Sequence, residues 1–402
     1  MIAYNTGVVL AGASFLGASS GLIGAFALLR RRALLGDTLA HAALPGLCLG
    51  FLAWGERSLP VMLAGALASG VAGIAVVAVL RRFTRIKDDA ALGIVLSLFF
   101  GAGLALLKYI QTHAVGGSRA GLDHYIFGSA ASMIAGDVKL IASVALVGLA
   151  AVVLLYKEFR LVTFDAPFAR VQGWPASLLD FLIMLLVSVT VIVALPAAGV
   201  VLTAALLILP AAAARFCTEW LSAMLVLSAL FGALAGASGT MLSAGGGMPT
   251  GPMIVLAGAT IFLSAMCFAP RRGILARALA DRRLRRRIDD QKTFLAFQRL
   301  RVPAGAAGMT FDALRSEVTF SPGRLRRALH RGEREGLLVG DGATWKLTED
   351  GHRRVASLAR AQRLWRAFLV EYPDLASTFA DLDMERIDEV LPTEMVAELE
   401  KI

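Results

Sequence analysis

The chain has 402 residues, of which 57% are hydrophobic and 17% charged, and its mean hydropathy is +0.69. Soluble domains of this length are less apolar, so the composition excludes a purely soluble protein. The formal net charge of +10 reflects 40 lysines and arginines against 30 acidic residues.

Long apolar runs separated by short charged breaks occupy the chain up to residue 269. Because about 20 apolar helical residues cross a bilayer core, these runs predict nine transmembrane helices, within a range of eight to ten. The predicted spans are residues 6–29, 35–54, 60–80, 89–108, 136–156, 177–195, 198–214, 219–241 and 251–269. The turn from Pro196 to Gly199 is the least secure break. We expect the first run to be an anchor, because its basic cluster follows it and a signal peptide has one before it.

Lysines and arginines between the spans set the predicted orientation. The larger clusters are Arg30 to Arg32, Arg81 to Lys87, Lys157 to Arg170, Arg215, and Arg271 with Arg272. With nine spans they all fall on one side, which the positive-inside rule makes cytoplasmic. We therefore expect the N-terminus outside and the C-terminal part in the cytoplasm.

Asp37 and His41 lie four residues apart inside the second apolar run. On a helix they share one face, so they could bind one cation together. A carboxylate and an imidazole suit Mn²⁺, Zn²⁺ or Fe²⁺, and ionisable residues in a membrane often mark an ion path. The alternative is a helix N-terminal charge and a histidine that hydrogen-bonds to a neighbouring helix. Pro45 and Gly46 suggest a broken or kinked helix, which favours the path.

Other polar residues in the membrane part have simpler interpretations. His113, Asp123 and His124 fall in an outer loop, where a solvated loop is favoured over a role in metal entry. Asp180 and Glu219 begin helices on the predicted cytoplasmic side, and we interpret both as helix N-terminal charges.

The cytoplasmic segment 157–175 places Phe164, Phe168 and Val171 at helical spacing. This pattern predicts a short amphipathic helix outside the membrane. Such a helix either rests on lipid or docks a cytoplasmic partner, and the pattern alone does not separate the two.

The part after residue 270 is charged like a soluble domain and opens with eight arginines between Arg271 and Arg287, which we interpret as a basic anchor beside the membrane. Beyond it, a helix near 311–314, a helix starting at Ser321-Pro322, and two strands around the turn at 340–342 predict a winged helix-turn-helix. The second helix carries candidate DNA or phosphate contacts, Arg324, Arg326, Arg327 and Arg331. A solvated basic face is the alternative.

Four segments of residues 1–270 resemble the permease subunits of manganese, zinc and iron ABC importers, the ABC-3 family. They are residues 36–46, 164–173, 199–215 and 249–256. The resemblance implies a homodimer or a pair with a sister permease, an extracytoplasmic metal-binding protein, and a separate ATPase. It makes Asp37 and His41 metal-path residues. It assigns the following residues to ATPase coupling: Phe164, Asp165, Phe168, Ala169 and Gly173. The chain has no GxxxxGK[ST] loop, so we expect it not to be an enzyme.

Residues 292–400 resemble the iron-dependent repressor family, an appendage that some permeases of this kind carry. The metal-sensing residues of that family are poorly matched, since Gln362, Arg366 and Asp381 stand where metal ligands are expected. The acidic residues Glu385, Asp388 and Glu389 could bind a hard cation weakly, although a solvated acidic face is favoured.

Together these patterns predict an all-α polytopic membrane protein with a C-terminal cytoplasmic α+β winged-helix domain. The predicted parts are a permease domain (1–270), a basic linker (271–290) and the winged-helix domain (291–402). The predicted function is import of divalent Mn²⁺, Zn²⁺ or Fe²⁺, which is cargo and not a permanent cofactor, across a bacterial inner membrane. Two alternatives stay open: a membrane-tethered metal-responsive transcription regulator that binds DNA, and an ion-gradient-driven metal transporter.

Overall fold

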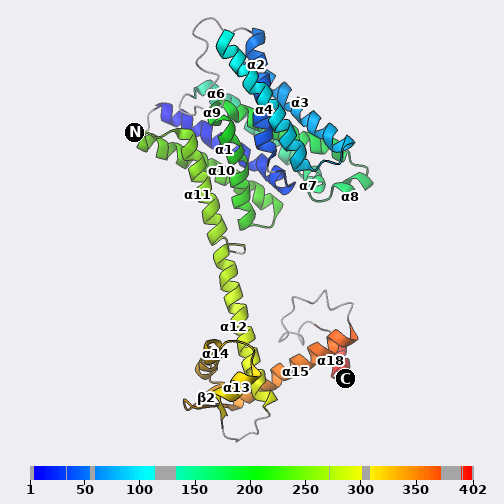
Figure 1. Ribbon diagram of the computed structural model, residues 1–402, viewed down its shortest axis with the longest axis vertical. Helices are drawn as coiled ribbons and strands as arrows, with labels where there is room; N and C mark the ends of the chain where they lie inside the picture. The colour runs from blue at the N-terminus through cyan, green and yellow to red at the C-terminus, as the bar shows by residue number, and fades with distance from the viewer. Residues whose placement is uncertain are drawn as a thin grey trace. The chain divides into compact units, whose positions relative to one another are not determined.

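The computed structural model describes residues 4–32, 34–54, 59–113, 133–270, 272–300, 308–372, 391 and 393–400. The chain forms two compact units, residues 1–277 and 278–402, and each is described by itself. Helix and strand labels follow Figure 1.

The first unit is entirely helical in its described residues. Its helices are α1 (Tyr4–Leu29), α2 (Leu35–Trp54), α3 (Leu59–Phe83), α4 (Asp88–His113), α6 (Ala135–Leu154), α7 (Tyr156–Phe164), α8 (Ala166–Val171), α9 (Ala176–Cys217), α10 (Leu221–Gly246) and α11 (Thr250–Phe268). Within the described part of the chain, nine segments are long and apolar enough to cross a membrane. The number and order of the predicted spans are therefore confirmed, with α9 supplying two of them.

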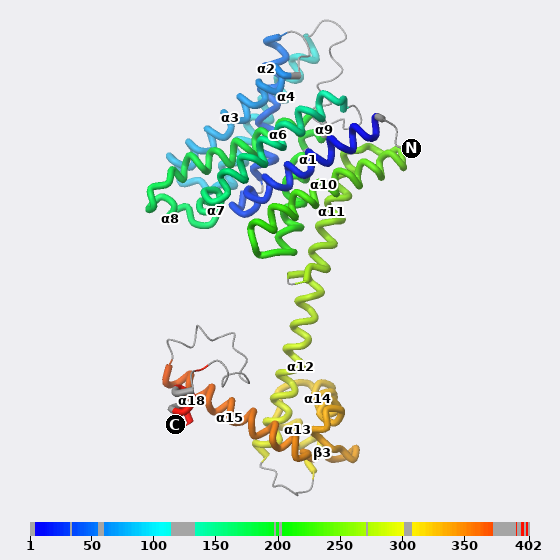
Figure 2. The backbone as a smooth tube through the Cα atoms, turned by 180° about the vertical axis from the view of Figure 1, so that it is seen from behind, coloured from blue at the N-terminus to red at the C-terminus, as the bar shows by residue number. Residues whose placement is uncertain are grey.

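The membrane helices form two groups that both contact α9. Helices α2, α3 and α4 pack on one another, while α1 packs along α10 and α6, and α11 packs on α10. Figures 1 and 2 show α2, α3 and α4 side by side, apart from α1, α10 and α11. Because α9 contacts α1, α10 and α11 as well as α2 and α3, it joins the two groups.

Close backbone contacts hold each group together. A Cβ added at Gly17 of α1 would clash with the carbonyl oxygen of Gly232 on α10, and one at Gly46 of α2 with that of Gly65 on α3. Such approaches need residues without side chains, and they give helices in lipid a large area of van der Waals contact. The α1–α10 and α2–α3 pairs are therefore tightly joined.

The break in the membrane helices lies in α9 and not in α2. Helix α2 continues through Pro45 as far as Trp54, so of the predicted break or kink at Pro45 and Gly46 the break is wrong. In α9 the backbone leaves the helical region at Gly199, with φ 73° and ψ 171°. The turn at Pro196 to Gly199, which the sequence marks as uncertain, is therefore where this helix divides.

The segment after α6 contains two short helices where the sequence predicts one. Helix α7 ends at Phe164 and α8 begins at Ala166, with Asp165 between them in a non-helical conformation. The Asp165 carboxylate accepts a hydrogen bond from the backbone N–H of Phe168 at 2.9 Å, which caps α8. The single amphipathic helix is therefore wrong, because this cap starts a new helix.

The second unit combines helices with a small sheet. Its elements are the C-terminal part of α12 (Ile274–Arg299), β1 (Met309–Thr310), α13 (Phe311–Glu317), α14 (Pro322–Arg334), β2 (Leu338–Gly340), β3 (Thr344–Leu347), α15 (Glu349–Glu371) and α18 (Thr393–Leu399). The sheet is antiparallel with strand order β1-β3-β2. Helix α14 follows Ser321 and has Pro322 in its first turn, as predicted, although the Ser321 side chain makes no capping hydrogen bond.

A compact apolar core supports this sheet. Phe297 of α12, Leu314 of α13, Leu325 of α14 and Trp345 of β3 are all buried in it. The indole N–H of Trp345 donates to the Glu333 carboxylate at 2.8 Å, which satisfies the ring's polar atom at the edge of the core.

Candidate metal path and coupling surface

Asp37 and His41 lie one helical turn apart on α2, with 3.5 Å between Asp37 Oδ1 and His41 Nε2. Metal–ligand bonds of about 2.0–2.2 Å place two ligand atoms roughly 3 Å apart around one ion. A small side-chain rotation would therefore let both atoms contact the same cation. Their side chains are 37% and 18% exposed, so an ion can reach them.

The pair lies on the accessible side of an otherwise enclosed helix. Leu34, just before α2, and Leu49, about four turns further on, are 47% and 54% exposed and continue this side along the helix. The neighbouring Thr38 is buried and donates to the carbonyl oxygens of Leu34 and Leu92. Asp37 and His41 are thus the polar positions on the open side of α2.

Packing fixes the His41 ring while leaving one of its nitrogens unsatisfied. The ring meets Phe100 of α4 edge-on, with 4.5 Å between centroids. Its Nδ1 is buried and has no hydrogen-bond partner among the residues that the structure describes. A buried polar atom without a partner costs stability, and a cation held between Nε2 and Asp37 would not supply that partner.

Two ligands do not complete a metal site. No group of three or more histidine, cysteine, aspartate or glutamate side chains that could hold a metal occurs in the described part of the chain. His113 lies at the far end of α4, where it stacks on Tyr109 with 4.3 Å between ring centroids. Asp123 and His124 lie outside the described residues. Among the described residues, the pair therefore has no third ligand of these types.

The predicted coupling residues divide into exposed and structural positions. Phe164 and Phe168 are 60% and 48% exposed, whereas Ala169 is fully buried. Asp165 caps α8. The two exposed rings, Phe164 at the end of α7 and Phe168 on α8, together with the 86% exposed Val171 of α8, are the apolar positions that we call the α8 knob.

Gly173 ends α8 in a conformation that other residues avoid. Its φ is +83°, its N–H donates to the Arg170 carbonyl, and the Trp174 N–H donates to the Ala169 carbonyl. This is the Schellman pattern of helix termination, in which glycine is preferred at the left-handed position. Its role in the structure is therefore to hold the end of α8.

We expect Gly173→Ala to destabilise α8, because an alanine in the left-handed region costs about 1–2 kcal/mol. The melting temperature of the purified protein should fall. Gly101→Ala is the matched control, since Gly101 lies within α4 and an added Cβ would meet no atom within 4 Å. Equal stability of the two variants would contradict the assignment.

Asp180 does not act as a simple helix N-terminal charge. Its carboxylate lies 2.9 Å from guanidinium nitrogens of both Arg30 and Arg32, and 3.8 Å from one of Arg81. Burial lowers the pKa of the Arg30 guanidinium, and the Asp180 charge opposes that change. Sequence reasoning missed this cluster. In the sequence, the only sign of this cluster is that Asp180 is an acidic residue within a predicted membrane helix, while the first and third predicted spans are followed by arginines.

Two of the four arginines predicted to contact DNA, Arg324 and Arg331, are held by carboxylates of α12. Arg324 forms two hydrogen bonds with the buried Asp289 of α12, at 2.8 and 2.6 Å, and Arg331 binds Asp290 at 2.6 Å. These hydrogen bonds raise the pKa of Arg324. Arg326 lies over the Phe311 ring, and Arg327 donates to the Gly323 carbonyl.

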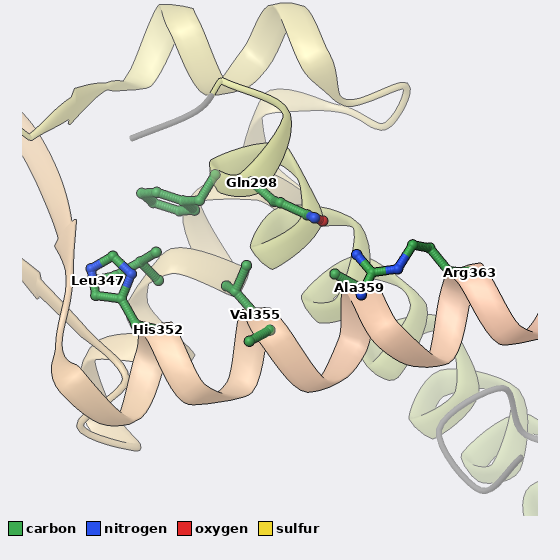
Figure 3. A pocket seen from close by; sticks show the side chains of 8 residues that line it. Gln298, Leu347, His352, Val355, Ala359 and Arg363 are labelled. Atoms are coloured by element: carbon green, nitrogen blue, oxygen red, sulfur yellow. The ribbon is translucent and has the colours of Figure 1, made fainter. Parts of the chain in front are cut away.

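A cavity of about 330 Å³ lies between the end of α12 and α15. Figure 3 shows His352 near one end of it, with Gln298 and Arg363 toward the other. Among its lining residues, His352 is the one side chain of a type that binds transition metals tightly. The predicted acidic ligands Glu385, Asp388 and Glu389 lie outside the described residues.

Comparison with known proteins assigns the chain to a family. Residues 4–269 match the model of the ABC 3 transport family, so the chain belongs to that family. It is 39% identical to the manganese transport system membrane protein MntC of Bacillus subtilis (strain 168) over 381 residues, which are 94% of this chain and 87% of that protein.

Two further matches are confined to a smaller part of the chain. The zinc transport system membrane protein TroC of Treponema pallidum (strain Nichols) is 42% identical over 70% of this chain and 94% of its own length. The structure of PsaBC from Streptococcus pneumoniae in complex with Fab has a TM-score of 0.60 and 29% identity, covering 67% of this chain and 93% of that one. The helical membrane fold is therefore one that a solved structure also has.

Proposed function

We propose that the chain is the membrane permease subunit of an ATP-driven importer that carries a divalent transition metal. The observation that carries the proposal is the Asp37–His41 pair, which presents a carboxylate and an imidazole to one cation on the open side of a buried helix. Family membership and the manganese and zinc transport named for MntC and TroC support it. The cargo is Mn²⁺ or Zn²⁺, with Fe²⁺ allowed by the same ligand chemistry.

An incomplete ligand pair suits transport better than storage. A site with two protein ligands holds a cation weakly enough to release it, while the cation's remaining positions are filled by water or by a second permease copy. An extracytoplasmic binding protein delivers the metal, and a separate ATPase supplies the energy. The protein lies in a bacterial cytoplasmic membrane with its N-terminus outside, an orientation supported by the one-sided lysine and arginine clusters.

The α8 knob docks the ATPase. Phe164 at the end of α7 and Phe168 on α8 supply exposed apolar contact, while Asp165, Ala169 and Gly173 hold α8. Exposed aromatic rings on both sides of the Asp165 cap favour a protein contact over loose insertion into lipid. An ion-gradient-driven transporter would have no need for such a surface.

The second unit is a cytoplasmic winged-helix domain that regulates transport. Its order of β1, α13, α14, β2 and β3, with β3 central in the sheet, supports this assignment. The B. subtilis MntC match covers 94% of the chain and so includes most of this unit. Because Arg324 and Arg331 are held by Asp289 and Asp290, the geometry favours a role within the transporter over DNA recognition.

The test is metal-resolved uptake by the complex of this chain with its ATPase and binding protein. ATP-dependent accumulation of Mn²⁺ or Zn²⁺ in proteoliposomes supports the proposal. Uptake that persists without ATP, driven by a proton or sodium gradient, would overturn it. Deletion of residues 288–402 should leave transport intact while changing its dependence on internal metal.

A further inference from the structure

Five charged side chains form one cluster where several membrane helices of the first unit end. Arg32 contacts Asp180 at 2.9 Å and Asp88 at 3.5 Å, Arg81 contacts Asp88 at 2.9 Å, and Arg30 contacts Asp180 at 2.9 Å. The side chains of Arg32 and Asp180 are 7% and 17% exposed. The cluster is therefore largely withdrawn from solvent around Asp180.

These side chains come from both helix groups. Arg30 and Arg32 follow α1, Arg81 is in the last turn of α3, and Asp88 begins α4. Asp180 lies in the second turn of α9, the helix that joins the groups. The ion pairs thus tie the end of the α1 group to the ends of α3 and α4 through two carboxylates, Asp180 and Asp88.

The two groups meet through apolar packing as well as through this cluster, because one buried core contains Ile23 and Ala27 of α1 together with residues of α2, α3, α4 and α9. Within a group, glycine backbones such as Gly17 and Gly232 pack so closely that separation would lose van der Waals contact with no replacement. An ion pair that separates into water regains hydration, so its net loss is small. Of the contacts between the groups, the charged cluster at the helix ends is therefore the one that can separate with the smallest loss.

The cluster lies at the end of α2 that carries Asp37. Thr38, the next residue, donates to the Leu92 carbonyl, one turn along α4 from Asp88. The Leu35 N–H at the start of α2 donates to the Arg32 carbonyl. Three guanidinium groups and two carboxylates leave one positive charge, which opposes the passage of a cation that leaves the Asp37–His41 pair.

We propose that Asp180 is the central residue of an ion-pair latch that closes the cytoplasmic end of the metal path and separates when the metal is released. This inference rests on the proposed transport function. Asp180 is a positioning residue in it, because it acts through the arginines and does not itself bind the metal.

The test measures access to the contact between α3 and α9 in the full complex. Ser188 of α9 is fully buried, and its Oγ would lie 2.9 Å from a Cβ added at Gly70 of α3. In a background with Cys48, Cys217 and Cys267 replaced, Ser188→Cys reports opening through its labelling rate with a water-soluble maleimide. We expect Asp180→Asn to raise that rate about tenfold and to increase the ATP hydrolysed for each Mn²⁺ or Zn²⁺ transported.

Rescue and control variants test whether Asp180 controls opening or only stabilises the fold. Asp180→Glu should restore slow labelling and tight coupling. Glu219→Gln is the matched control, because Glu219 pairs with Arg272 at 3.2 Å next to α10 and α11, within one helix group. This variant should label like the parent protein. If Asp180→Asn does not fold, Asp88→Asn removes the more exposed part of the cluster and should give an intermediate rate.

A labelling rate and coupling ratio in Asp180→Asn equal to those of the parent would overturn the latch. So would a lower melting temperature without faster labelling. Failure of the proposed function would look different, since the parent complex itself would then not import metal, whereas the labelling assay requires no transport.

Discussion

Replacing either Asp37 or His41 with alanine is expected to abolish uptake of Mn²⁺ and Zn²⁺ by the assembled complex. Each variant leaves one protein ligand, and the described residues offer no third metal-binding side chain near the pair. A single ligand cannot offset the dehydration of a divalent ion inside the membrane. Accumulation of each metal in proteoliposomes, measured by mass spectrometry, should fall to the level of empty vesicles.

Both variants should still fold and assemble. Asp37 lies in the first turn of α2 with its side chain 37% exposed, where its charge contributes about 0.3–1 kcal/mol to the helix. His41→Ala loses an edge-on contact with Phe100, worth about 0.5–1.5 kcal/mol. These losses are small beside the packing of the surrounding helices, so co-purification with the ATPase should persist.

His330→Ala is the control for removal of an imidazole. His330 is exposed in the second unit, where it pairs with Glu333 at 2.9 Å, and its loss should leave uptake unchanged. Parent-like uptake by both Asp37→Ala and His41→Ala would remove these residues from the metal path and leave the transport assignment resting on family membership.

The membrane spans could be predicted because hydropathy is a local property. Each span is a run of about 20 apolar residues, and the nine predicted runs agree with the nine apolar segments that the structure describes. The pairing of Asp37 with His41 could also be predicted, since four residues on a helix fix their proximity. Their separation of 3.5 Å follows that expectation.

The wrong predictions are those in which the surrounding structure overrides what a short stretch of sequence favours. Pro45 and Gly46 predict a broken or kinked helix, yet α2 continues through both residues, and most of its residues are buried. Phe164, Phe168 and Val171 fit one helix by spacing, but the Asp165 carboxylate caps the Phe168 N–H and starts a second. Because the residues on both sides of Asp165 are helical, the spacing of the apolar residues does not show that one helix ends and another begins there.

The missed contacts are those between residues far apart in the sequence. Arg32 and Asp180 are separated by 148 positions, and Asp289 and Arg324 by 35. A single sequence gives no measure of which helix ends meet, so arginines with long-range partners look like a basic face. This is why Arg324 and Arg331 are predicted as phosphate contacts and are found in ion pairs.

Phe168→Asp is expected to prevent docking of the ATPase and so to eliminate ATP-dependent transport. The Phe168 ring is 48% exposed on the α8 knob, and a carboxylate there would be buried without a partner in an apolar contact, which is strongly unfavourable. The change should not unfold α8. Phe168 is the third residue of that helix, and an acidic residue in the first turn interacts favourably with the helix dipole.

The measurement is co-purification of the ATPase with the permease, followed by the rate of ATP hydrolysis with and without metal. We expect loss of the ATPase from the complex, with the permease itself stable. Val339→Asp is the matched control, because Val339 is an exposed apolar residue in the second unit, 60% exposed on β2. If Phe168→Asp retains the ATPase as fully as Val339→Asp does, the exposed rings do not form the docking surface. They would then be better explained by contact with lipid.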